Sequence, residues 1–396
     1  MTYREGRTLT VLSMFSGCGG MDLGFVQAGY EIVWANDIDE DACATYRRNI
    51  GEIHEGDVRN LEVPNIDDLD VLIAGFPCQP FSNAGNRRGL EDPRGQLYRI
   101  CLEYVERLHP KAVLLENVRG ILSIRSEKGT LIEEICSRLV DIGYEVHFKL
   151  VDATEYGVPQ HRLRVIIVGV KRGIAPSGFR FPRPIEGMDL RLRTCLDVPP
   201  GTPNQNDVIR LNPQAMYLGS LIPEGGSWKD VPYDLLPDRL KRIRNNMRRY
   251  RWPNFYRRYH RDEIAGTVTA AFKPENAGVW HPTENRPLSA REIARIQTFP
   301  DDFVFVGRSV KAIYSMIGNA VPPRLARTFA EMLGNVLRGV PVDLGRPLVA
   351  YSQLGKRPIR PSDPEIVFDR PRRESTEESG RPVPHQLDLF EVTEAC

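Results

Sequence analysis

Short apolar runs alternate with helical patterns over the first 170 residues, and this alternation constrains the fold more than any other feature. Runs such as VLIAG and VIIVGV are wholly apolar, as is typical of strands buried on both faces of a parallel sheet. The expected strands are Thr8–Phe15, Glu31–Asp37, Val71–Gly75, Ala112–Asn117, Glu145–Asp152 and Arg164–Val170, with helices near Asp39–Asn49, Gln96–Leu108 and Thr130–Ile142. The pattern predicts an α/β fold with a doubly wound, mostly parallel sheet.

The texture of the chain changes after about Gly173, where Pro, Gly, Asn and Arg become frequent and hydrophobic periodicity weakens. A capping-box sequence, Ser289-Ala-Arg-Glu292, then marks a helix start, and another helix is expected over Pro323–Leu337. The last part of the chain is rich in Pro and Arg, a composition typical of disorder. The expected parts are a first domain over 1–173, an irregular domain over 174–286, a return segment over 287–339 that completes the first domain, and a disordered tail over 340–396.

Composition excludes several classes of protein. No run approaches the roughly 18 consecutive apolar residues of a membrane helix, and the N-terminus has no apolar signal core. We therefore expect a cytoplasmic protein without a membrane partner. The seven cysteines are scattered and include no Cys-x-x-Cys pair, which argues against a disulfide framework and against a zinc ribbon. We expect no metal.

The net charge of +1 hides a strongly basic segment. Arg239–Arg261 contains ten Lys or Arg residues and no acid, and five aromatic residues interleave these charges. Clustered cations suit a phosphate backbone, and aromatic rings among them can pack on sugars or bases. A solvated, Arg-rich helix face and another anionic partner are the alternatives that this segment alone leaves open.

A glycine-rich turn, FSGCGGMDLGF over Phe15–Phe25, follows the first expected strand. Such a turn lets a ligand approach the backbone and the next helix N-terminus, and the missing Gly-Lys-Ser/Thr ending excludes a Walker loop. Asp37 ends the second strand, where an acid suits ribose hydroxyls. Asp57 would end the third strand and could meet an adenine amino group. These residues indicate an adenosine-type ligand, although a plain tight turn explains the glycines equally well.

Reactive side chains stand at further strand ends. Cys78, in FPCQPFS, follows an apolar strand at the carboxyl edge, where open α/β sheets place their chemistry, so it is a candidate nucleophile. Glu116 ends another apolar run and is a candidate proton carrier. Arg162 and Arg164 share one face of an extended segment and could pair with Glu116 or with a polar base. The alternatives are a packing cysteine, a helix cap or salt bridge for the acid, and an edge-strand ion pair.

Six motifs occur in order along the chain: FSGCGGMDLGF, FPCQPFS, ENV, QHRLR, RPLSAREIARIQTFPDDF and IGNAVP. In this order and spacing they resemble those of the DNA (cytosine-5)-methyltransferases, in particular the bacterial type II modification methylases. The resemblance covers about residues 8–338, except the middle domain, which varies in that family. It implies a Rossmann-like methyltransferase fold that uses S-adenosylmethionine.

The resemblance also implies a covalent mechanism. The target cytosine would be flipped out of the duplex, the Cys78 thiolate would add to C6, and Glu116 would hold or protonate N3. Arg164 would contact the base O2, and Arg162 would help to position the site. After methylation at C5, loss of the C5 proton and elimination of Cys78 would release 5-methylcytosine and S-adenosylhomocysteine.

The same resemblance implies contacts to the cofactor and to DNA. Expected cofactor contacts are Phe15, Gly17, Cys18, Gly19, Gly20, Leu23, Asp37, Ile38, Asp57, Val58, Pro77, Asn319 and Val321. Ile38 departs from members that place an aromatic residue against adenine. Expected DNA contacts are Ser82, Arg248, Arg249, Arg251, Arg257, Arg258 and Thr267.

The middle domain would then be a target-recognition domain for double-stranded DNA, and its length suits one target sequence. Asn83–Arg94 resembles the mobile loop that closes on DNA in this family, the alternative being an ordinary surface loop. In the tail, QLDLF (Gln386, Leu387, Asp388, Leu389 and Phe390) resembles the pentapeptide by which bacterial replication proteins bind the sliding clamp. A chance amphipathic end is the alternative there. We expect a nucleoid-associated monomer.

The leading functional hypothesis is sequence-specific DNA cytosine-5 methylation, in a restriction–modification system or by a solitary methylase. A tRNA cytosine methylase is the first alternative, which a comparison of duplex DNA with tRNA as methyl acceptor would test. A non-catalytic cofactor-binding regulator is the second, against which the intact reactive residues argue.

Overall fold

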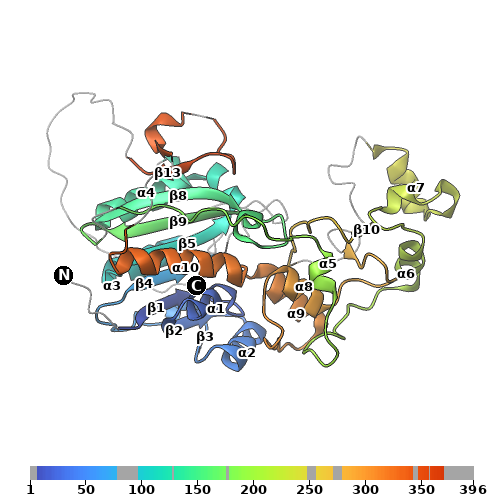
Figure 1. Cartoon of the computed structure of the whole chain (residues 1–396), viewed down its shortest axis with the longest axis horizontal. Coiled ribbons are helices and arrows are strands. Elements are labelled where there is room, and N and C mark those ends of the chain that lie inside the picture. The colour runs from blue at the N-terminus through green and yellow to red at the C-terminus, as the bar shows by residue number, and fades with distance from the viewer. Residues whose placement is uncertain are drawn as a thin grey trace, which may run out of the picture.

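A computed structural model of the protein describes residues 7–77, 97–126, 129–174, 178–247, 256–270, 279–341, 347–355 and 357–369. A nine-stranded sheet with helices on both faces forms the larger part, and a smaller part that contains α6 and α7 lies at one end (Figure 1). Within the described ranges, no helix is long and apolar enough to cross a membrane.

The sheet has the strand order β12-β13-β8-β9-β5-β4-β1-β2-β3. Neighbouring strands from β5 to β3 are parallel, whereas β9 is antiparallel to both β5 and β8. The strands are β1 (Leu9–Met14), β2 (Tyr30–Asp37), β3 (His54–Glu55), β4 (Val71–Ala74), β5 (Ala112–Val118), β8 (Tyr144–Asp152), β9 (Leu163–Lys171), β12 (Leu348–Ala350) and β13 (Glu365–Val367). All six expected strands are present, and the mostly parallel α/β fold is confirmed.

The helices cover both faces because successive strand residues point to opposite sides of the sheet. Along β4, Leu72 packs in the core under α3 and α4, whereas Ile73 packs in the core under α1 and α10. The helices of these two layers are α1 (Gly20–Gln27), α3 (Leu97–Leu108), α4 (Leu131–Ile142) and α10 (Pro323–Leu337), and α2 (Glu40–Asn49) lies beside β2 and β3. The three helices expected before residue 150 and the helix over Pro323–Leu337 are therefore confirmed.

Helix α10 returns from the far end of the chain to pack directly on α1 (Figure 1). Gly24 makes this approach possible, since a Cβ on it would lie 2.5 Å from the carbonyl oxygen of Pro323. Close contact between these helices also brings Val321 to the glycine-rich turn, where a Cβ on Gly20 would lie 2.4 Å from the Val321 oxygen.

The expected disorder of the tail is wrong for most of residues 347–369. Strand β13 joins the sheet antiparallel to β8, and its Ile366 is fully buried opposite Phe148. Its neighbour Glu365 accepts a backbone hydrogen bond from Phe181 (2.8 Å) and lies 2.6 Å from Nδ1 of the buried His147. The Pro and Arg content that suggested disorder does not prevent a few apolar residues from docking on an open sheet edge. Residues 370–396 lie outside the described ranges.

Short elements complete the fold. Helix α8 (Ala290–Ile296) begins at Ser289 with the expected capping box, which is confirmed. The remaining helices are α5 (Arg193–Leu196), α6 (Pro213–Ser220), α7 (Asp238–Arg244) and α9 (Val310–Asn319), and the short 3-10 helices are Val58–Asn60, Arg119–Ser123, Ala153–Tyr156, Trp228–Asp230, Tyr233–Leu235 and Tyr351–Gln353. Two small pairings join β6 (Arg125–Ser126) to β7 (Gly129–Thr130) and β10 (Arg257–Arg258) to β11 (Val279–Trp280).

Candidate active site

Four strands end side by side and bring several expected site residues to one edge of the sheet. The sheet register places in one row Asn36, Met14, Ala74 and Leu115. The residues that follow them along the chain, and so line the edge, are Asp37, Phe15, Gly75 and Glu116. This is the carboxyl edge, where open α/β sheets bind their ligands.

Glu116 and Arg164 form an ion pair at this edge. The Arg164 Nε lies 2.6 Å from the Glu116 Oε1, and each side chain is 11% exposed. Their contact follows from the antiparallel pairing of β9 with β5, which puts the amino end of β9 beside the carboxyl end of β5. The small Gly75 leaves the acid open toward β4, since even a Cβ there would lie 3.8 Å from Glu116 Oε2. An acid and a paired guanidinium in this position suit a polar ring that needs both an acceptor and a donor.

Arg162 is buried and bonds to backbone oxygens through its two Nη atoms, while its Nε has no hydrogen-bond partner in the described structure. Its Nη1 donates to Val268 (2.8 Å), and its Nη2 donates to Gly318 (2.9 Å) and Ala320 (3.0 Å). Burial lowers the pKa of this guanidinium well below its usual value, and the neighbouring Arg164 lowers it further. The side chain therefore ties three segments together, which agrees with a positioning role.

The glycine-rich turn combines positive φ angles with open space beside its backbone. Phe15 has φ of 57°, a conformation that a bulky residue adopts only where the surroundings impose it, and Gly17 and Gly19 have φ of 57° and 88°. A Cβ on Gly17 would meet nothing within 4 Å, so its backbone faces open space. The Gly17 N–H donates to Asp37 Oδ2 (2.7 Å), which fixes the turn against the end of β2.

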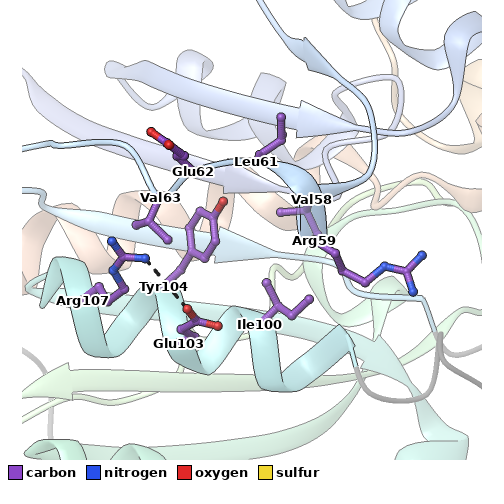
Figure 2. Close-up of a pocket in the computed structure, with 9 residues that line it drawn as sticks. All are labelled: Val58, Arg59, Leu61, Glu62, Val63, Ile100, Glu103, Tyr104 and Arg107. Atoms are coloured by element: carbon purple, nitrogen blue, oxygen red, sulfur yellow. Dashed lines mark ion pairs between the residues drawn. The ribbon is translucent and has the colours of Figure 1, made fainter. Parts of the chain in front are cut away.

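The two acids expected at the adenosine end lie in different surroundings. Burial raises the pKa of Asp37, whereas the hydrogen bond from Arg59 lowers the pKa of Asp57. A cavity of about 600 Å³ is lined by Val58 and Arg59, the two residues that follow Asp57 in the chain (Figure 2). Figure 2 shows Val58 and Tyr104 lining it, and the buried Tyr104 hydroxyl has no hydrogen-bond partner in the described structure.

The other expected cofactor residues differ in exposure. Val321 and Cys18 are buried, Leu23 and Pro77 are half-buried, and the side chain of Asn319 is exposed at the end of α9. Burial raises the pKa of the Cys18 thiol, which disfavours its thiolate form. Ile38 is 66% exposed at the carboxyl edge. In the described ranges, no three His, Cys, Asp or Glu side chains gather in a group that could hold a metal ion.

Of the expected DNA contacts, Arg258 is not available to DNA. It is 5% exposed, and its guanidinium donates to the backbone oxygens of Gly219 (2.8 Å), Ile222 (2.8 Å) and Glu284 (2.7 Å). These bonds hold the smaller part together, so its role is structural. A basic segment does not reveal from its sequence which of its arginines turn inward.

Two other expected DNA contacts lie at the surface. Arg257 pairs with Glu263, and Thr267 is exposed with its hydroxyl donating to the His161 oxygen (2.7 Å). Cys78, Ser82, Arg248, Arg249 and Arg251 lie outside the described residues, as do the Asn83–Arg94 loop and the QLDLF segment.

Three buried polar residues of the site were not expected. Gln160 and Gln297 hydrogen-bond to each other (2.7 Å). They belong to the motifs QHRLR and RPLSAREIARIQTFPDDF, in which no role was expected for the glutamines. Asp22, in the glycine-rich motif, is fully buried, and its Oδ1 accepts from the Tyr46 hydroxyl (2.8 Å). Burial raises the pKa of Asp22 to about 6. The position of this acid among the apolar residues of FSGCGGMDLGF was the sequence signal that could have indicated its burial.

Several known proteins are similar to this chain over most of its length. The family model described as C-5 cytosine-specific DNA methylase matches residues 9–335. Type II methyltransferase M.NgoFVII of Neisseria gonorrhoeae is 39% identical over 327 residues, which are 79% of this chain and 83% of that protein. Type II methyltransferase M.Eco47II of Escherichia coli is 37% identical over 350 residues, which are 83% and 79% of the two chains.

Solved structures agree as well. The structure of a putative DNA modification methyltransferase encoded within a prophage of E. coli superposes with a TM-score of 0.60 at 25% identity, covering 83% of this chain and 99% of that one. The S. pombe Dnmt2 methyltransferase superposes with a TM-score of 0.57 at 19% identity, covering 82% and 98%, and supports the fold alone.

Proposed function

The chain belongs to the C-5 cytosine-specific DNA methylase family and is a DNA cytosine-5 methyltransferase of the type II restriction–modification kind. From this premise we infer the roles of its residues. The observation that carries the assignment is the Glu116–Arg164 pair at the carboxyl edge, next to the strand that leads into Cys78. The relatives with substantial identity are DNA methyltransferases, so the tRNA alternative is not favoured.

Glu116 and Arg164 would recognise the flipped cytosine. Glu116 holds or protonates N3, which draws electrons from the ring and favours addition of the Cys78 thiolate at C6. Arg164 donates to O2, while its Nε keeps the carboxylate of Glu116 oriented. C5 thereby becomes nucleophilic, takes a methyl group and loses its proton, and elimination of Cys78 restores the aromatic ring.

The glycine-rich turn and its neighbours fit an S-adenosylmethionine molecule, which supplies the electrophilic methyl group when bound. The open space over Gly17 leaves room for a ligand, and the close approach of Val321 to Gly20 brings this second expected cofactor residue to the turn. Asp37 would hold the ribose hydroxyls and Asp57 the adenine amino group. The cavity lined by Val58 would leave room for the adenine ring of the cofactor (Figure 2).

The segment 174–286 would read one DNA target sequence. Arg257 and Thr267 lie at the surface within residues 256–270, and the one lysine and three arginines of α7 add positive charge. Phosphate contacts of this kind supply affinity and register, whereas base contacts supply specificity.

Bisulfite sequencing of DNA from cells that express the protein tests this function. Methylated cytosines should appear within one short motif, and a Cys78→Ala variant of equal abundance should leave that motif unmethylated. Loss of the mark in Glu116→Gln with soluble protein would extend the result to the acid. An unmethylated genome in cells with soluble wild-type protein would contradict the proposal.

The tail would bind the bacterial sliding clamp through QLDLF, because an apolar pair in a polar segment suits a short linear motif. A pull-down with purified clamp should capture the wild-type protein and fail with Leu389→Ala combined with Phe390→Ala. Capture of the double variant would refute the clamp proposal without touching the methylation proposal. We also propose that the enzyme acts as a monomer, which light scattering with and without DNA would test.

A further inference from the structure

A chain of two buried amides connects Val268, in the 174–286 segment, to Ile317, near the end of α9. The Val268 N–H donates to Gln160 Oε1 (2.8 Å), Gln160 Nε2 donates to Gln297 Oε1 (2.7 Å), and Gln297 Nε2 donates to the Ile317 oxygen (2.6 Å). Both glutamine side chains are 0% exposed. We call this chain of hydrogen bonds the amide relay.

The relay has only one orientation. Turning the Gln297 amide over would set its oxygen against the Ile317 oxygen and its NH₂ group against that of Gln160. Turning the Gln160 amide over would set its NH₂ group against the Val268 N–H. Hydrogen bonds aligned in this way polarise one another, and breaking any of them leaves a buried donor or acceptor without a partner. A displacement at one end is therefore transmitted to the other.

The two ends of the relay lie beside the residues that we assign to DNA and to the cofactor. At one end, Ala265 bridges to Gln160 and accepts from the His161 N–H (2.8 Å), which fixes the segment that carries Thr267. At the other end, Ile317 stands two residues before Asn319. The backbones also touch, since a Cβ on Gly318 would lie 2.4 Å from the carbonyl carbon of Thr269.

We propose that Gln160 and Gln297 are positioning residues that couple DNA binding by the 174–286 segment to cofactor affinity. When DNA draws Val268 into place, the relay sets the Ile317 carbonyl and with it Asn319 and Val321. The inference deepens the proposed function, because it rests on the assignment of these two residues to the cofactor. By linkage, the cofactor must strengthen DNA binding by the same factor.

The test measures S-adenosylhomocysteine binding by calorimetry, with and without a saturating duplex that contains the motif found by bisulfite sequencing. In the wild-type enzyme the duplex should tighten binding by a factor in the range of about 5–150. Gln297→Met, close in volume but unable to hydrogen-bond, should keep the affinity measured without DNA and lose most of the tightening. Gln160→Met should do the same and serves as the second variant if Gln297→Met does not fold.

Two comparisons separate coupling from stability. The double variant should lose no more tightening than either single variant, because a relay is already broken by one missing link. Ile293→Val shortens a buried apolar side chain on the same helix and leaves the backbone hydrogen bond from the Gln297 N–H to the Ile293 oxygen in place, so it should lower the melting temperature and keep the tightening.

The outcomes distinguish this inference from the proposed function. Tightening retained in both single variants, tightening absent from the wild type, or equal loss in Ile293→Val would overturn the inference and leave the cofactor assignment standing. Failure of the wild-type enzyme to bind S-adenosylhomocysteine at all would overturn the cofactor assignment, and the inference with it.

Discussion

Gly24→Ala should destabilise the protein, although alanine is the better helix former. Helix propensity by itself favours the change by about 1 kcal/mol. The added Cβ, however, would lie 2.5 Å from the Pro323 oxygen and 2.6 Å from the Arg327 nitrogen, which are backbone atoms of the helix packed on α1. Relief requires α1 and α10 to separate, at the upper end of the about 1–3 kcal/mol that overpacking costs. The net loss in the free energy of unfolding should be about 1–2 kcal/mol.

Urea unfolding followed by circular dichroism measures this loss. Val26→Ala is the matched control, because Val26 lies on the exposed side of α1 (42% exposed) and the change improves propensity without a contact to α10. Since α10 begins two residues after Val321, separation of the helices should also weaken cofactor binding. A Gly24→Ala protein as stable as the wild type would refute the packing argument.

Three further predictions follow from buried charges. Asp22→Asn should stabilise the protein more at pH 8 than at pH 5, by about 1.4 kcal/mol. Burial raises the pKa of this acid to about 6, so folding stability is lost as pH rises from about 4 through 6, and roughly half of that loss falls between the two pH values. Equal effects in urea unfolding at both pH values would contradict this. Arg258→Met should lower the free energy of unfolding by about 1–3 kcal/mol for each backbone oxygen left unpaired, and an unchanged melting temperature would refute this. Arg257→Met should change DNA affinity more than stability. Burial lowers the pKa of His147, but its hydrogen bonds to the carboxylates of Glu145 and Glu365 raise it more, so β13 should dock more firmly below that raised pKa than above it. Hydrogen exchange of β13 should therefore speed up as pH rises, after correction for the intrinsic rate, and should lose this dependence in Glu365→Gln.

Much of the site could be predicted because its chemistry is local in the sequence. Phe15, Asp37 and Glu116 each end an apolar run, and the alternation of runs already implied that parallel strands would align these ends. The Arg164–Glu116 contact needed one more fact, the antiparallel direction of β9, which a single apolar run does not encode.

The misjudged residues share one physical cause, since their roles depend on partners far along the chain. Arg258 and Arg257 are neighbours in one basic run, yet Arg258 is held inside by carbonyl groups 23 to 39 residues away and Arg257 is half-exposed. The 347–369 segment has the composition of a disordered tail and is ordered by a sheet edge built some 200 residues earlier.

The sequence alone determined the order of strands and helices, the reactive residues at their ends and the family to which they belong, because these depend on periodicity and on neighbours within a few positions. Only the tertiary structure decided which polar groups are buried and what they bind. It alone joined Gln160 to Gln297 across 137 positions and turned Arg162 toward three carbonyl groups. Burial and hydrogen-bond geometry depend on the whole packed chain, and a polar residue carries the same letter whether it faces water or completes a network inside the protein.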